Sequence, residues 1–480
     1  MNILMAAAEM SPFVRNGELG DAVSRLSAEL RRQGHEVSVV IPCYRAVREG
    51  KNRLKKTGVK FSVNIGPGRY PCEIFELKSP EGVQVFAVAR DEYFDRSGIY
   101  GVDGRDYQDN AARFIFFTKC VVELARRMEP LPDILHCHSW ETALAPVFCR
   151  DQRLPFRTVL TPHGLEYQGN FWSYDFALTN LPGEYFSARG VEYFGSMNCL
   201  KGGILFADAV ALPGERFASE AQTPAGGCGL DPVLREHQHK LFGIPECSGL
   251  EGWTPSSDSA LTAKYGPGEP GRKSANRAPF LRACELAPDP VRGVLVAFAE
   301  AGPGLDILLA SLDRLLADDC RLVLLGGVNP SLTVPLEVAR RKHRGRFAHL
   351  AAPEEKMARL ALAGSDLLLV PGPVEPRATW LRRAVRYGTV PVALQCGGLF
   401  QLVRDFEPAF GTGNGFTFRS ATADGLVDVT RRALYLLGQD AHRQALVAAN
   451  LGIDFSHEST ARAYLGLYSR LLGQPALRAA

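Results

Sequence analysis

The first 42 residues decide the fold: MNILMAAAEMSPFVRNGELGDAVSRLSAELRRQGHEVSVVIP, residues 1–42. An apolar run over residues 2–8 predicts a buried strand, and a loop with two glycines follows at residues 11–20. Apolar side chains then recur at helical spacing over residues 21–33, and residues 37–41 are a second apolar run. A strand, a glycine loop, a helix and a strand form the βαβ unit of a doubly wound α/β sheet. Such sheets bind ligands at the carboxyl ends of their strands.

The same alternation continues along the chain and predicts two lobes. Further strands are expected at residues 133–135, 158–161, 209–212, 293–298, 321–325, 366–370, 390–394 and 415–418. The sequence therefore predicts four segments: a Rossmann-like lobe at residues 1–245, an inter-lobe crossing rich in Pro, Gly and Ser at 246–290, a second Rossmann-like lobe at 291–455, and a C-terminal helix at 456–480 that can pack back on the first lobe.

Composition excludes several classes of protein. The 480 residues are 46% hydrophobic and 22% charged, which is typical of a chain with a large buried core. A net charge of +3 gives no basic footprint for nucleic acid. No stretch of about 18 apolar residues is present, so no membrane span is expected. The loop NGELGD lacks the GxGxxG pattern, which argues against a dinucleotide-dependent oxidoreductase.

The cysteines and the first residues indicate a cytoplasmic protein. The 11 cysteines are scattered and form no pattern with metal-ligand spacing, which is typical of free thiols in a reducing compartment. The opening MNILMAAAEM is too short and lacks the basic start of a signal peptide, so a buried first strand is the better interpretation. We therefore expect no metal site and no cofactor.

The loop at residues 11–21 is the first candidate ligand site. Backbone N–H groups at the start of a helix favour a phosphate, and Gly17 allows the backbone to approach a ligand closely. Arg15 adds a positive charge, but the carboxylate of Glu18 would repel an anion. An ordinary βα turn is the alternative interpretation.

Histidines follow two of the expected strands. His136 and His138 lie in HCHSWETA, and they share one face only where the backbone stays extended. With no third ligand nearby, a structural pair is favoured over a metal site. His163, in TPHGLEYQG, stands at a strand end where its ring can donate to a sugar hydroxyl; a capping or core histidine is the alternative.

The second lobe offers a carboxylate and a glycine turn. Glu375 and Arg377 lie in PGPVEPRATW, just past the strand expected at 366–370, where a carboxylate can hold sugar hydroxyls. Gly397 and Gly398 lie in CGGLF and can open a helix towards a phosphate. A solvated glutamate and a plain turn are the alternatives.

These blocks, taken in order, resemble the family of bacterial glycogen synthases and plant starch synthases. The resemblance spans residues 2–468. It rests on the opening run to residue 23 and on DYQDNAARFIFF, PDILHCHSWETALAPVF, TPHGLEYQG, GVEYFGSMNCLKGGILFAD, QTPAGGCGLDPVL, GWTPSSD and RYGTVPVALQCGGL.

The resemblance implies the GT-B fold, two Rossmann-like doubly wound lobes facing a central cleft. It also implies glucosyl transfer from ADP-glucose to the non-reducing end of an α-1,4-glucan, with retention of configuration and without a metal. Carried over by position, His163 and Glu375 are the catalytic candidates. The substrate-binding candidates are Arg15, Gly17, His138, Gly397, Gly398 and Arg377.

The chain departs from the family pattern where the diphosphate is handled. By resemblance, Phe298 and Pro303 replace the arginine and lysine that grip the diphosphate, and Glu18 replaces the second glycine of the loop. Ser139 replaces an aspartate, and residues 377–380 replace a cysteine-glycine-leucine-threonine run. Arg15, in place of a lysine, keeps the charge but not its geometry.

Three hypotheses follow. The first is a divergent copy that is catalytically impaired, with or without a role in binding glucan or a partner. The second is a working α-glucan synthase in which other residues, such as Arg377, compensate. The third is a transferase that uses another nucleotide sugar.

Overall fold

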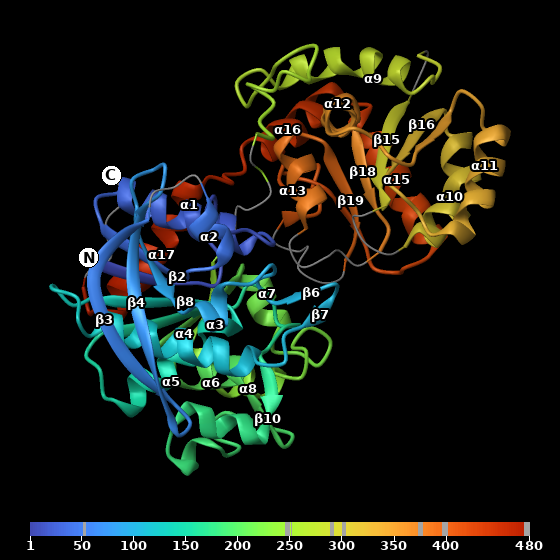
Figure 1. Cartoon of the computed structure of the whole chain (residues 1–480). Helices are drawn as coiled ribbons and strands as arrows, with labels where there is room; N and C mark the ends of the chain where they lie inside the picture. Colours follow the sequence, from blue (N-terminus) through green and yellow to red (C-terminus); the bar gives the residue numbers. More distant parts are fainter. Residues whose placement is uncertain are drawn as a thin grey trace. The chain divides into compact units, whose positions relative to one another are not determined.

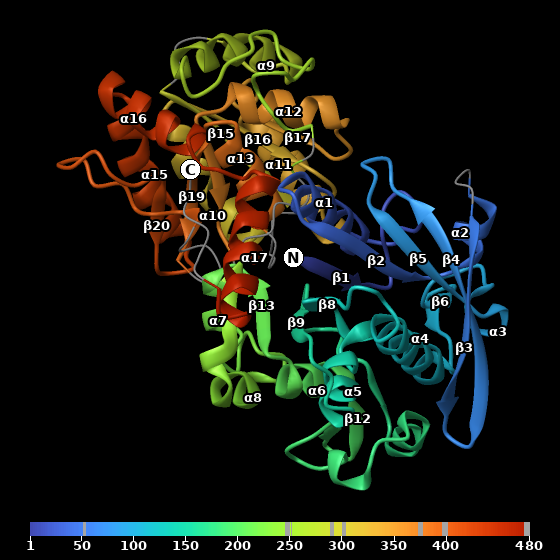
Figure 2. The same cartoon turned by 90° about the vertical axis from the view of Figure 1, so that its left-hand side faces the viewer.

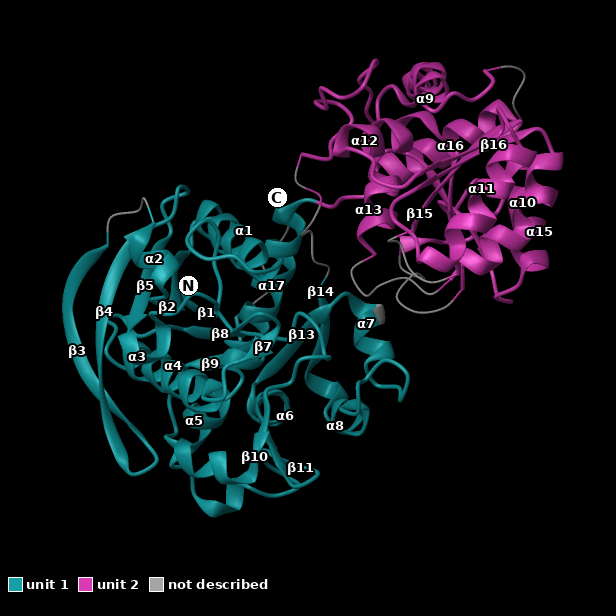
Figure 3. Ribbon diagram, turned by 45° about the vertical axis from the view of Figure 1, so that its right-hand side comes forward, with its two compact units in different colours: residues 1–248, 456–480 teal, residues 249–455 magenta. Residues whose placement is uncertain are grey.

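The computed structural model describes residues 1–50, 54–244, 250, 252–288, 292–299, 304–372, 378–395 and 402–474. The chain divides into two compact units, residues 1–248 with 456–480 and residues 249–455 (Figure 3). Each unit is built on its own mainly parallel sheet with helices around it, as Figures 1 and 2 show.

The first unit is built on a sheet of nine described strands. In spatial order they are β14 (Leu241–Ile244), β13 (Ala209–Pro213), β9 (Arg157–Thr161), β8 (Ile134–His138), β1 (Asn2–Ala6), β2 (Glu36–Pro42), β5 (Gln84–Ala89), β4 (Gly68–Lys78) and β3 (Lys55–Ile65). All neighbours from β14 to β5 pair in parallel, and β4 and β3 are added in antiparallel fashion. The strand order reverses between β1 and β8, which is the topological switch point of a doubly wound sheet.

Burial explains why these strands differ in composition. Residues 3–8 are almost wholly buried, as the continuous apolar run NILMAAA requires of a strand in the centre of the sheet. The edge strand β3 instead begins with two exposed lysines and alternates apolar with polar residues over residues 59–65, so one of its faces is largely solvated. Helices cover the sheet: α1 (Leu19–Arg32), α2 (Arg45–Glu49), α3 (Asp91–Phe94), α4 (Asn110–Ala125), α5 (Ala145–Asp151), α6 (Cys199–Phe206), α7 (Glu215–Glu220) and α8 (Asp231–Glu236).

The C-terminal helix α17 (His457–Leu471) belongs to the first unit, where it lies beside α1. Two tyrosines attach it to the central strands. The Tyr468 hydroxyl is 2.7 Å from His136 Nδ1, and the Tyr464 hydroxyl is 3.0 Å from Thr161 Oγ1. All four side chains are buried, so these bonds tie the chain end to β8 and β9.

A small antiparallel sheet extends from the first unit below the main sheet in Figure 3. It consists of β10 (Asn170–Trp172), β12 (Ser196–Asn198) and β11 (Glu192–Tyr193), in that spatial order. The 3-10 segment η2 (Ser173–Thr179) directly follows β10 in the sequence. A second small ladder joins β6 (Gly101–Val102) to β7 (Arg105–Asp106).

The second unit has a sheet of six described parallel strands. In spatial order they are β17 (Phe347–Leu350), β16 (Cys320–Leu325), β15 (Gly293–Phe298), β18 (Leu367–Val370), β19 (Val390–Leu394) and β20 (Phe416–Phe418). This is the order 3-2-1-4-5-6 of the Rossmann fold, with its switch point between β15 and β18. The helices are α9 (Arg277–Ala283), α10 (Leu305–Ala317), α11 (Thr333–Lys342), α12 (Glu355–Gly364), α13 (Thr379–Arg386), α15 (Ala423–Leu437) and α16 (Asp440–Leu451).

Part of the Pro- and Gly-rich stretch that was expected to join the lobes is folded onto the second unit. The 3-10 segment η5 (Pro270–Asn276) and α9 pack against α12. Lys273, in η5, is buried and donates to the carbonyl oxygens of Leu362 and Ala363 at 2.7 and 2.9 Å.

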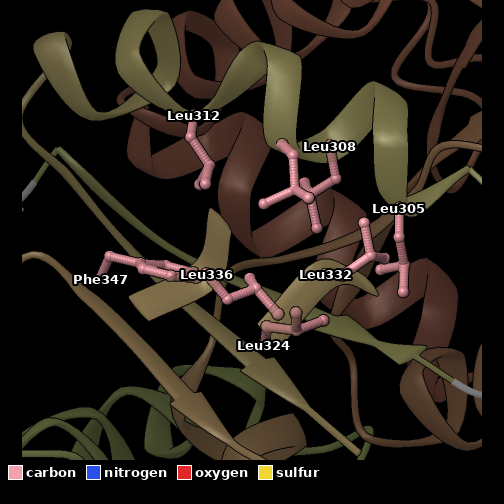
Figure 4. Close-up of a pocket in the computed structure, with 8 residues that line it drawn as sticks. Leu305, Leu308, Leu312, Leu324, Leu332, Leu336 and Phe347 are labelled. Atoms are coloured by element: carbon pink, nitrogen blue, oxygen red, sulfur yellow. The ribbon is translucent and has the colours of Figure 1, made fainter. Parts of the chain in front are cut away.

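The core of the second unit contains a narrow gap between α10 and the strands β16 and β17. Leucines and one phenylalanine line it, as Figure 4 shows: Leu305, Leu308, Leu312, Leu324, Leu332, Leu336 and Phe347. The gap has no room for a water molecule, so it is a packing feature and not a ligand site. Among the described residues, no helix is both long and apolar enough to cross a membrane.

Candidate active site

The switch point of the first sheet brings three polar segments together. The parallel strands β1, β8 and β9 are neighbours, so the loops after their carboxyl ends start side by side. These loops carry the glycine loop after β1, His138 at the end of β8 and His163 just after β9. The register pairs His138 with Thr161, so these two strands end level with each other.

A buried carboxylate organises the glycine loop. Glu9 is 3% exposed, and its Oε2 accepts hydrogen bonds from the backbone N–H groups of Asn16 and Gly17 at 2.5 and 3.1 Å. The Tyr100 hydroxyl donates to Oε1 of the same carboxylate at 2.7 Å. The N–H of Gly17, a residue expected to let the backbone approach a ligand, therefore already has a side-chain partner inside the protein.

The one positive side chain of the loop, Arg15, is offset by nearby carboxylates. Arg15 is exposed and forms an ion pair with Asp21 at 2.9 Å, and Asp21 also accepts from the Ser11 hydroxyl at 2.6 Å. Glu18 is the N-cap residue of α1, so its carboxylate is placed at the positive end of the helix. Both features reduce the attraction of this loop for a phosphate.

The two candidate histidines contact each other. His138 Nδ1 lies 3.0 Å from His163 Nε2, and the rings are stacked with their planes 24° apart. Burial lowers the pKa of His138 well below its ordinary value, so its ring is neutral at neutral pH. His163 is only partly buried, so the contact joins the buried, neutral ring of His138 to a histidine nearer the surface.

His136 has a structural role. The strand stays extended to its end, so His136 and His138 share one face, with ring centroids 4.1 Å apart. His136 Nε2 is 2.7 Å from Thr161 Oγ1 and its Nδ1 contacts Tyr468, and burial lowers its pKa to about 3. The described residues contain no group of three or more His, Cys, Asp or Glu side chains that could hold a metal ion.

The edge of the second sheet where its parallel strands have their carboxyl ends, called the ligand edge because such sheets bind ligands there, carries an aromatic stack. Phe298, the last residue of β15, is 5% exposed and lies parallel to Trp380 in the first turn of α13, with ring centroids 3.9 Å apart and planes 10° apart. Trp253 meets Trp380 edge-on at 5.8 Å. The Arg383 guanidinium lies over both indoles, 4.2 Å from the Trp253 centroid and 4.8 Å from the Trp380 centroid.

A glycine allows two neighbouring loops at this edge to approach each other closely. Gly304 precedes α10 with a φ of +106°, and a Cβ at this position would come within 2.7 Å of the Gly372 backbone nitrogen. The loop that follows β15 and the loop that follows β18 therefore touch through their backbones, which only glycine allows. Pro303, Glu375, Arg377, Gly397 and Gly398 lie outside the described residues.

Sequence reasoning missed the residues that surround these candidates. Glu9 was visible as a carboxylate directly after an apolar strand, a position where a charge needs partners. Glu141, in HCHSWETA, is 4% exposed, and burial raises its pKa to about 8. Its position directly after the strand that ends at His138 was the available signal.

Comparison with known proteins identifies the fold family. A model of the starch synthase catalytic domain matches residues 2–236. The chain is 34% identical to a glycogen synthase of Opitutus terrae over 480 residues, which cover 98% of this chain and 99% of the relative. The protein belongs to the glycogen synthase and starch synthase family.

Other relatives and solved structures agree with this family. The chain is 34% identical to glycogen synthase 2 of Geobacter sulfurreducens over 98% of both chains. The catalytic domain of starch synthase IV from Arabidopsis thaliana, solved with ADP and acarbose, superposes with a TM-score of 0.76 at 26% identity, over 98% of this chain and 99% of that one. A sucrose-phosphate synthase from Thermosynechococcus elongatus shares only the fold, with a TM-score of 0.52 at 15% identity.

This glycogen synthase family member therefore has the GT-B fold that the sequence blocks predicted, with a Rossmann-like sheet in each unit. Family members act on a nucleotide sugar and a glucan. In this member, Phe298 at the end of β15 is stacked on Trp380.

Proposed function

We propose that this family member binds an α-1,4-glucan but is impaired in glucosyl transfer from ADP-glucose. The observation that carries the proposal is the Phe298–Trp380 stack at the ligand edge of the second unit. By resemblance, the family places at position 298 an arginine that grips the diphosphate of the donor.

The chemistry of the reaction gives this replacement its weight. When the bond between glucose and the diphosphate breaks, negative charge accumulates on the departing ADP, and without a metal the protein must stabilise it. Losing one preorganised group of this kind costs about 10²- to 10³-fold in rate. A buried phenyl ring covered by an indole offers neither a charge nor a hydrogen bond to that diphosphate.

The glycine loop of the first unit also supports the proposal. By resemblance, the second glycine of the loop near the donor is replaced by Glu18. The N–H groups of Asn16 and Gly17 are occupied by Glu9. The contact between His138 and His163 is still present, so the loss falls on the handling of the diphosphate and not on every part of the site.

An active synthase with a compensating cation is the second candidate. Arg383 favours it, because its guanidinium lies 4.8 Å from the Trp380 ring and so belongs to the same edge of the sheet. A third candidate is a transferase for another nucleotide sugar, which has the same need for a cation at the diphosphate.

ADP release tests these alternatives. The purified full chain is mixed with ADP-glucose and a maltooligosaccharide primer, with the Opitutus terrae glycogen synthase as a positive control. The proposal predicts turnover at least about 100-fold below that control. If the unchanged protein turns over as fast as the control and the Arg383→Ala variant turns over more slowly, the compensated synthase would be established instead. UDP-glucose and GDP-glucose as donors, with the release of UDP or GDP followed instead of ADP, test the third candidate.

A further inference from the structure

A hollow of about 600 Å³ lies on the first unit, beside one face of α1. Asp21, Arg25, Ala28 and Arg32 line it at intervals of three or four residues, so one face of the helix forms most of its wall. Of the candidate site residues that the structure describes, none lines this hollow. Its volume is that of a site for a small molecule.

Two further elements contribute side chains to the hollow. The turn between β4 and β5 supplies Pro80 and Glu81, and in this turn the Gly82 N–H donates to the Ser79 carbonyl oxygen at 2.9 Å. His457 is the first residue of α17, the helix that lies beside α1 (Figure 2). The positive end of the α17 dipole therefore lies at the hollow, where it favours an anion.

The carboxylates that α1 presents to the hollow are already engaged by other side chains. Glu29 accepts from Arg32 Nη2 at 2.7 Å and from Gln33 Nε2 at 2.8 Å. Asp21 forms the ion pair with Arg15 at 2.9 Å. The negative charge of both carboxylates is therefore compensated within the protein.

Arg31 supplies a cation that is not compensated in this way. It is exposed in the last turn of α1, and none of the described residues forms a hydrogen bond or ion pair with its guanidinium. A Cβ on Gly82 would lie 3.7 Å from its Cζ, so the guanidinium lies against the turn between β4 and β5. Arg25 adds a second guanidinium to the lining. The planar fork of N–H donors in arginine suits the oxygens of a phosphate group.

Glu81 argues against a bare anion as the ligand. Its carboxylate is exposed, and no described residue forms an ion pair with it. It repels negative charge but accepts hydrogen bonds from hydroxyl groups, so a fitting ligand has an anionic end and a hydroxylated end. The half-buried hydroxyl of Ser24 and the C–H groups of Pro12, Pro80 and Ala28 suit a sugar ring.

The side chains of the lining also argue against a nucleotide. Among the described residues that line the hollow, none is a phenylalanine, tyrosine or tryptophan. Such rings are the usual stacking partners of a base. A sugar ring presents only C–H and hydroxyl groups, so it has no such requirement.

We infer that this hollow binds a small phosphorylated sugar, with its phosphate on Arg31 and Arg25 and its hydroxyl groups towards Glu81 and Ser24. Asp21 lines the hollow and also holds Arg15, so the bound sugar phosphate lies next to the glycine loop. The inference does not rest on the proposed function, because Arg31 and Glu81 have no part in the case for impaired transfer.

Calorimetry on the full chain tests the inference, with glucose 6-phosphate as the probe. Glucose and inorganic phosphate are titrated separately, and both are expected to bind more weakly than glucose 6-phosphate. Arg31→Ala is expected to raise the Kd for glucose 6-phosphate about tenfold, as the loss of one charge-assisted contact requires. Arg31→Lys, which keeps the charge, is expected to raise it less. Glu81→Ala is expected to reduce the preference for glucose 6-phosphate over inorganic phosphate.

Arg150→Ala is the matched control. Arg150 is likewise an exposed arginine in the last turn of a helix of the first unit, α5, and its removal is expected to leave the Kd unchanged. Since Arg31 is exposed, Arg31→Ala is expected to fold, and an unchanged thermal unfolding midpoint verifies it.

Four results would overturn the inference. The first two are an unchanged protein with no affinity for glucose 6-phosphate and an Arg31→Ala variant that binds it as tightly as the unchanged protein. The third is inorganic phosphate that binds as tightly as the sugar phosphate, which would make the hollow a site for an adventitious ion only. The fourth is binding that saturating ADP abolishes, which would place the probe in the donor site. The rate of ADP release enters none of these comparisons, so either proposal can fail without the other.

Discussion

The phenyl ring of Phe298 is covered by the indole of Trp380, at a centroid distance of 3.9 Å. The two residues come from different elements at the same edge of the second sheet: Phe298 is the last residue of β15, and Trp380 lies in the first turn of α13. The stack is therefore part of the packing of that edge, and by the resemblance it stands at a position that the proposed function assigns to the diphosphate.

Phe298→Ala is expected to destabilise the protein. The ring is 5% exposed, and truncating a buried phenylalanine costs about 3 kcal/mol or more in the free energy of unfolding. Urea unfolding followed by tryptophan fluorescence measures the loss, because Trp253 and Trp380 report on the second unit. Phe410→Ala, at a ring that is 76% exposed in the same unit, is the control and is expected to change stability by less than about 0.5 kcal/mol. Equal losses in the two variants would show that the stack contributes nothing.

Restoring the diphosphate cations tests the chemical side of the same position. Phe298→Arg with Pro303→Lys is expected to raise ADP release only slightly, because Glu18 still opposes the charge of the donor in the first unit. Adding Glu18→Gly is expected to raise it further, by about 10²-fold or more for the complete set. The effects are coupled, so each combination is measured separately. A large gain from the first pair alone would show that the loop does not limit the rate.

Protonation of His136 links stability to acid pH. Burial lowers its pKa to about 3, so below about pH 6.5 the unfolded chain binds a proton at this residue that the folded chain does not. Relative to His136→Gln, the protein should lose about 1.4 kcal/mol per pH unit between pH 6 and 4. Denaturant unfolding at several pH values measures this difference. His239→Gln, at an exposed side chain in the short segment after α8, is the control. Parallel pH profiles for the protein and His136→Gln would contradict the assignment.

Glu141 has the opposite pH dependence. Burial raises its pKa to about 8, so above about pH 4.5 the unfolded chain releases a proton that the folded chain keeps. Stability from this group is present below pH 4.5 and is lost as the pH rises towards 8. Glu141→Gln removes the titrating group, so its stability relative to the unchanged protein should rise by about 1.4 kcal/mol per unit from pH 5 to 7.5. A constant difference over that range would show that Glu141 is ionised in the folded protein.

The sequence predicted the elements of the switch points well, because their signals are local. The strand expected at residues 2–8 is β1 at Asn2–Ala6, and the helix expected at 21–33 is α1 at Leu19–Arg32. The strand at 293–298 was predicted with both ends correct. Continuous apolar runs and a glycine at the helix end are sufficient for such assignments.

Strands and partners that depend on distant residues were not predicted. The strands β3 and β4 were missed, since β3 begins with two lysines and has a glycine within it. The partner of Phe298 is 82 positions away in the sequence, and the partner of His136 is Tyr468, so neither pairing leaves a local pattern. The positions of these candidate residues could be read from the sequence, but their side-chain environments could not.

Loss of the diphosphate grip is proposed to slow glucosyl transfer by this family member. The most direct measurement is the initial rate of ADP release by the unchanged full chain at saturating ADP-glucose and maltooligosaccharide, beside the Opitutus terrae glycogen synthase at equal concentration. A rate at least about 100-fold lower than that of the relative is expected. A rate within about tenfold of the relative, which corresponds to no more than about 1.4 kcal/mol in the barrier, would contradict it.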